Sequence, residues 1–97
     1  MLDIKKLTQE VLENKINNHF PTDDLGHEFE LLVKEVVEAE EVLNDPSKLG
    51  KELADIVIFA MSIARIVKVD LEQEIVDKVE YIKTRTYKAG TFRITGT

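Results

Sequence analysis

Two pairs of acidic residues share a spacing that places each pair on one side of a helix. Glu35 and Glu38 form the first pair, and Glu52 and Asp55 form the second. Residues at i and i+3 are neighbours on a helix surface, so each pair presents two carboxylates together. The chain has no cysteine and two histidines, and carboxylate oxygens suit a hard cation such as Mg²⁺, with Mn²⁺ as the alternative. The spacing therefore indicates a candidate metal site.

The same four acids point toward surfaces that are expected to be buried. At about 100° per residue, Glu52 falls among the apolar residues of its helix and Asp55 borders them. Glu35 lies inside the apolar arc of its own helix and Glu38 lies at the edge of that arc. Buried carboxylates are costly and repel one another, and bound cations relieve both costs. The alternative is that these acids form ordinary solvated faces, since the chain has 19 Asp and Glu residues.

Four helices are predicted to position these acids in an all-α fold. Apolar periodicity, caps and breakers predict helices over about 3–18, 24–43, 46–67 and 70–87. Short connections between the last three helices favour antiparallel neighbours. On the third helix, the side away from the predicted core carries Lys51, Ser62 and Arg65.

The length and composition indicate one small globular domain. The chain has 97 residues, of which 43% are hydrophobic and 33% are charged. We expect one helical domain over 1–90 and a C-terminal tail over 91–97. The net charge of −6 argues against general nucleic-acid binding, and no apolar stretch is long enough to span a bilayer. The first residues show no secretory signal, so a cytoplasmic location is expected.

A basic segment near the C-terminus completes a recognisable order of motifs. Glu35-Val-Val-Glu38, thirteen residues, and Glu52-Leu-Ala-Asp55 are followed by a segment that contains Lys78 and Arg85. This order resembles the ExxE…ExxD signature and basic last helix of MazG-like nucleoside triphosphate pyrophosphohydrolases, over about residues 28–90. The sequence departs from the family pattern at three positions, with Ile82 for Asn, Thr86 for Pro and Ala89 for His.

The resemblance implies a four-helix MazG-like fold assembled as a homodimer or as a dimer of dimers, a homotetramer. It implies Mg²⁺-dependent hydrolysis of a nucleoside triphosphate to a monophosphate and pyrophosphate, as in house-cleaning of a nucleotide pool. The metal ligands would be Glu35, Glu38, Glu52 and Asp55. Either Glu35 or Glu38 would orient or deprotonate the attacking water. The phosphates would be bound by Lys78 and Arg85.

Two other readings remain open at the level of sequence. Related all-α pyrophosphatases act on dUTP or phosphoribosyl-ATP, so the same site could serve either substrate. A non-catalytic helical dimer that binds a nucleotide or a partner protein is the second reading, because Ile82 replaces the family Asn. Three aromatic residues in or after the loop before the second helix, Phe20, His19 and His27, could contact a base, although we expect a packed Phe and two surface histidines.

Overall fold

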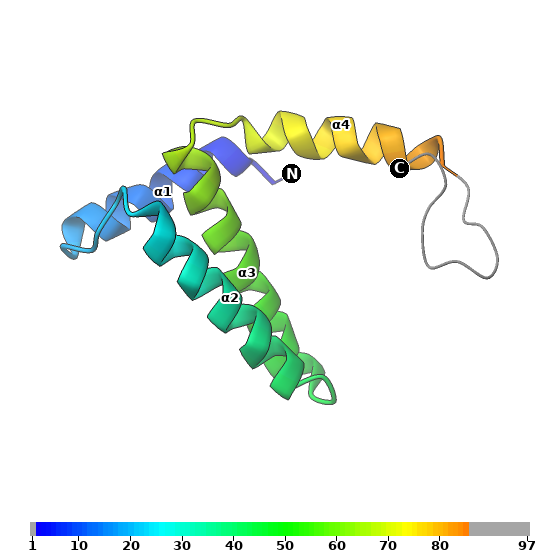
Figure 1. Cartoon of the computed structure of the whole chain (residues 1–97), viewed down its shortest axis with the longest axis horizontal. Coiled ribbons are helices and arrows are strands. Elements are labelled where there is room, and N and C mark those ends of the chain that lie inside the picture. The colour runs from blue at the N-terminus through cyan, green and yellow to red at the C-terminus, as the bar shows by residue number, and fades with distance from the viewer. Residues whose placement is uncertain (1, 86–97) are drawn as a thin grey trace.

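The computed structural model describes residues 2–85, and in that range it contains four helices and no strand. The helices are α1 (Ile4–Asn17), α2 (Leu25–Glu41), α3 (Pro46–Ile66) and α4 (Leu71–Lys83) (Figure 1). The predicted all-α fold with four helices is therefore confirmed. The predicted tail over 91–97 lies outside the described residues, as do Thr86 and Ala89.

Each helix begins after an aspartate that caps it. The side chains of Asp3, Asp24, Asp45 and Asp70 each accept a hydrogen bond from the backbone N–H three residues later. Such a cap satisfies one of the N–H groups that a helix start leaves unpaired, and contributes about 1 kcal/mol. Pro46 occupies the first turn of α3, where its missing N–H costs nothing. The four helix starts were all predictable from these local signals.

Two helices end earlier than predicted. The α2 helix stops at Glu41 because Val42 turns the backbone, with its N–H bonded to the carbonyl of Ala39. The α4 helix stops at Lys83, where the Thr84 hydroxyl and N–H both donate to the carbonyl of Tyr81, at 2.7 and 3.1 Å. The predicted ranges 24–43 and 70–87 are thus too long at their C-terminal ends.

The α1 and α3 helices end in the same backbone motif, which places a left-handed residue directly after the cap. His19 and Lys68 both have a φ of 60°. After α1, the N–H of Phe20 donates to the carbonyl of Lys15 and the N–H of His19 to that of Ile16. This Schellman pairing satisfies the last carbonyls of the helix and reverses the chain. A residue other than glycine takes the left-handed conformation in both cases, at a steric cost.

The α2 and α3 helices form an antiparallel hairpin, and α1 crosses the open end of the hairpin against α3 (Figure 1). The α4 helix leads away from the hairpin, and its main contacts are with α1. The N–H of Ile4 donates to Oε1 of Glu72 at 3.2 Å, which joins the starts of these two helices. The buried apolar residues of the described chain are Ile4, Ala39, Met61 and Ala64.

Most of the large hydrophobic side chains remain open to solvent in the single chain. Among residues 2–85, nineteen of them are at least 36% exposed, against four buried apolar residues. One set forms the apolar side of α4 (Ile75, Val76, Val79 and Ile82, 44–51% exposed). Another lies on the hairpin (Val36, Val37 and Leu53, 50–51% exposed). Exposed apolar surface on this scale marks an interaction surface.

Candidate metal centre

The hairpin brings the two predicted acid pairs together. The short connection after α2 returns the chain at Asp45 and Pro46, so α3 runs back along α2. Glu35, Glu52 and Asp55 each offer one carboxylate oxygen, and these three oxygens lie within 4.8 Å of one another. Ligand oxygens of one octahedral Mg²⁺ lie about 2.1 Å from the ion and so at most about 4.2 Å apart, which is close to the spacing of this set. The prediction that residues from both pairs converge is confirmed for these three.

Glu38 borders this group without joining the three-oxygen set. Its carboxyl is close enough to that of Glu35 to raise the Glu35 pKa, through hydrogen bonding and through its negative charge. The side chain of Glu38 is half-buried, like those of Glu35 and Glu52. All four predicted acids therefore gather at one place on the hairpin, three as a compact set and the fourth beside it.

The cluster raises the proton affinity of one of its members. The pKa of Glu35 rises from 4.5 to about 7, first because of its hydrogen bond with the Glu52 carboxyl. Burial raises it further, as do the hydrogen bond to Glu38 and the negative charges of Glu38 and Asp55. Carboxylates this close cannot all remain ionised without a compensating positive charge.

That positive charge does not come from the side chains of residues 2–85. The ion pairs there join Lys5 to Asp70, Lys15 to Glu28, Arg65 to Asp23, and Lys83 to Glu80. Atoms Oε2 of Glu35 and Oε2 of Glu52 are buried and have no hydrogen-bond partner. Buried acceptors without donors are uncommon in proteins and are usually satisfied by a water or an ion. The donor set and these unpartnered oxygens fit a divalent cation.

The two predicted phosphate-binding residues lie away from the acids in the single chain. Lys78 and Arg85 meet around the ring of Tyr81, with Nζ of Lys78 5.6 Å and Cζ of Arg85 3.8 Å from the ring centroid. Lys78 lies on α4, whereas Arg85 follows the end of that helix at Lys83. Helix α4 extends away from the hairpin that carries the acids (Figure 1).

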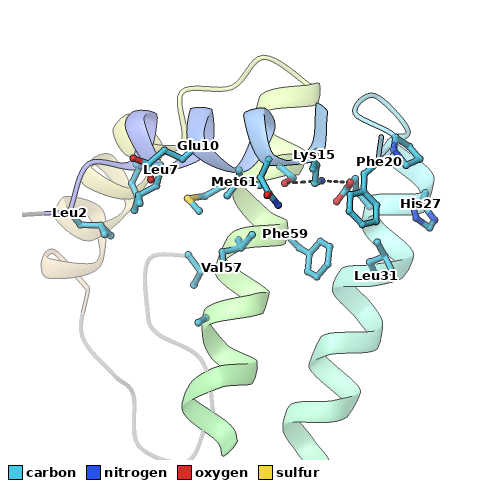
Figure 2. Close-up of a pocket in the computed structure, with 18 residues that line it drawn as sticks. Leu2, Leu7, Glu10, Lys15, Phe20, His27, Leu31, Val57, Phe59 and Met61 are labelled. Atoms are coloured by element: carbon cyan, nitrogen blue, oxygen red, sulfur yellow. Dashed lines mark hydrogen bonds and ion pairs between the residues drawn. The ribbon is translucent and has the colours of Figure 1, made fainter. Parts of the chain in front are cut away.

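A groove with a volume of about 740 Å³ adjoins the hairpin, between α1, α2 and α3 (Figure 2). The expectation that Phe20 is packed is wrong, because its side chain is 59% exposed at this groove. The placement of Ser62 away from the core is also wrong, because α1 covers that side of α3 and buries Ser62 to 3% exposure. Projection of α3 alone could not reveal the contact with α1.

Sequence analysis also missed an ion pair inside this groove. Nζ of Lys15 lies 2.5 Å from Oε1 of Glu28 and donates to the hydroxyl of Ser62 at 3.2 Å. The Lys15 and Glu28 side chains are 15% and 3% exposed. The sequence feature that could have indicated this ion pair is Glu28, because it projects to the same side of α2 as Glu35.

None of the helices in the described range is both long and apolar enough to cross a bilayer.

Comparisons with models of known families, with curated proteins and with solved structures give no significant match.

Proposed function

We propose that this protein is a Mg²⁺-dependent nucleoside triphosphate pyrophosphohydrolase of MazG-like type, which cleaves a (d)NTP to a (d)NMP and pyrophosphate. The observation that carries the proposal is the convergence of three carboxylate oxygens within 4.8 Å, two of the contributing residues having an unpartnered buried oxygen. Triphosphates bind Mg²⁺ through their own oxygens, so an acidic metal site can hold a substrate that the bare acids would repel.

The proposed roles follow the positions of the acids. Glu35, Glu52 and Asp55 would hold Mg²⁺, which when bound supplies positive charge to the phosphate oxygens and acidifies a water. Glu38 lies beside this set, and in this proposal its carboxylate would orient that water or accept its proton. The water would attack the α-phosphorus in line, and the α–β bond would break with pyrophosphate as the leaving group.

A second copy of the chain would complete the site. The apolar sides of α4 and of the hairpin are exposed in one chain, and a homodimer, or a dimer of such dimers, would bury them against each other. The α4 helix of one copy would then lie along the acids of the other. That arrangement would bring Lys78 and Arg85 to the leaving pyrophosphate, whose charge they would help to neutralise.

The experiment is a panel of the common NTPs and dNTPs with Mg²⁺, extended to dUTP and phosphoribosyl-ATP, which scores pyrophosphate against orthophosphate. Glu38→Gln should abolish pyrophosphate release. Glu40→Gln, which changes an exposed acid on the same helix, is the matched control and should retain the wild-type rate. Metal-dependent stabilisation without turnover of any nucleotide would instead indicate the non-catalytic binding protein.

A further inference from the structure

The groove beside the hairpin contains a buried acceptor that the metal centre does not use. Glu28 is 3% exposed and lines the groove, and its Oε1 is occupied by Lys15 at 2.5 Å. Its other oxygen, Oε2, is buried and has no hydrogen-bond partner among the described residues. Leaving such an oxygen without a donor costs about 1–3 kcal/mol. A ligand that supplies an N–H in the groove would recover this cost.

The groove walls suit a flat ring. Phe20, His27 and Leu31 lie on one side of the groove, and Val57 and Phe59 come from α3 (Figure 2). The Schellman turn after α1 is what carries the Phe20 side chain to the groove while leaving it 59% exposed. Aromatic faces bind nucleic-acid bases by stacking, worth about 1–3 kcal/mol per base. A volume of about 740 Å³ falls within the usual range of ligand pockets.

The polar residues of the groove lie at the same distance from the acids of the metal centre on both helices of the hairpin. Glu28 precedes Glu35 by seven residues on α2, and Ser62 follows Asp55 by seven residues on α3. Seven residues are two helical turns, or about 10.5 Å. The polar end of the groove therefore lies two turns from the acids on both helices. A nucleotide joins a ring bearing N–H groups to its phosphates through a sugar of comparable span.

We propose that this groove binds the nucleobase, with Oε2 of Glu28 accepting a hydrogen bond from a ring or amino N–H. Lys15 occupies Oε1 of Glu28 through their ion pair, which leaves Oε2 as the oxygen that can accept from a ligand. Its contact with Ser62 ties this pair to α3. The identification of the ligand as a nucleotide rests on the proposed function, whereas binding of the base requires no metal and can be measured separately.

The test is titration of the common ribo- and deoxyribonucleosides, which lack phosphates, into the full chain in EDTA. Backbone amide NMR shifts would report the binding. We expect at least one nucleoside to saturate shifts at His27, Leu31 and Phe59 below about 10 mM. Absence of shifts with every nucleoside up to that concentration would overturn the proposal.

The informative variant replaces both members of the ion pair, Lys15→Met with Glu28→Met. Removing one partner alone would strand a buried charge and could unfold the chain, whereas an apolar pair of similar volume is usually tolerated. Nucleoside affinity should fall roughly 10- to 100-fold, as expected for a lost hydrogen bond to a charged group. Unchanged affinity in a folded double variant would contradict the role of Glu28.

Two comparisons separate this proposal from the proposed function. The Glu52→Gln variant alters the metal centre and should bind nucleosides like the wild type. If nucleosides bind but the triphosphate panel yields no pyrophosphate, the base site stands and the catalytic proposal fails. If pyrophosphate is released but nucleosides do not bind, the catalytic proposal stands and the base site fails.

Discussion

Replacing Glu35 with Gln should stabilise the metal-free protein at alkaline pH. The pKa of Glu35 rises from 4.5 to about 7 mainly through its contact with the Glu52 carboxyl, so the ionised form opposes folding. At about 1.36 kcal/mol per pKa unit, this rise corresponds to about 3.4 kcal/mol. Because Glu35 is only half-buried, solvent screening reduces the expected effect to about 1–2 kcal/mol. For a domain of this size, that is a rise in Tm of roughly 5–10 °C.

The pH dependence has a defined sign. A carboxyl whose pKa is raised in the folded state contributes stability that is complete below 4.5 and is lost as the pH rises through about 7. Glu35→Gln should therefore melt above the wild type at pH 8 in EDTA, and the difference should largely vanish at pH 4.5. Thermal melts followed by circular dichroism at one fixed protein concentration would measure this, since association shifts Tm.

Addition of Mg²⁺ should reverse the order of the two melting temperatures, so that the wild type melts above Glu35→Gln. Wild-type protein gains about 2.7 kcal/mol when the free ion exceeds its Kd a hundredfold, whereas Glu35→Gln lacks a ligand and should gain far less. Glu40→Gln, an exposed acid on the same helix, should follow the wild type in every condition. A Glu35→Gln variant that melts below the wild type in EDTA at pH 8 would refute the view that the cluster is strained without metal.

Four further predictions concern the catalytic acid, the pH dependence of metal binding, the backbone and the assembly. Glu38→Gln should lower kcat for pyrophosphate release at least about 100-fold, because the Glu38 carboxylate acts on the attacking water. The variant should keep its stabilisation by Mg²⁺ in thermal melts, and loss of that stabilisation would show that Glu38 is a metal ligand. The Mg²⁺ affinity measured by calorimetry should fall roughly tenfold per pH unit below about 7, since Glu35 must release a proton, and a flat profile would contradict this. Lys68→Gly should raise the free energy of unfolding by about 1 kcal/mol, because only glycine adopts a φ of 60° without steric cost, and denaturant unfolding would show it. Leu53→Glu should shift the chain to monomer in light scattering, whereas an unchanged mass would place the interface elsewhere.

Local signals accounted for the helix starts and for the acid cluster. Asp3 and Asp70 cap their helices through bonds that span three residues, so no knowledge of the rest of the fold was needed. Glu35 and Glu52 converge because one short connection forces α3 back along α2. The spacing of residues along the chain is therefore enough to predict local geometry of this kind.

The features that could not be predicted depend on contacts between distant segments. Ser62 is buried by α1, which lies 47 residues earlier in the chain at Lys15. Phe20 is exposed because a left-handed residue reverses the chain before it, and His19 carries no sequence signature as strong as glycine. The end of α4 depends on Thr84 bonding back to the Tyr81 carbonyl, which propensity does not reveal.

The short connection between α2 and α3 also has a kinetic consequence. Glu38 and Glu52 are separated by thirteen residues, so the acid cluster closes a small loop and belongs to the lowest contact order part of the chain. We therefore expect the hairpin to form early in folding, before α1 docks, so that the carboxylates approach one another in that step. Their mutual repulsion should slow that step. A cation that neutralises them would accelerate folding as well as slow unfolding.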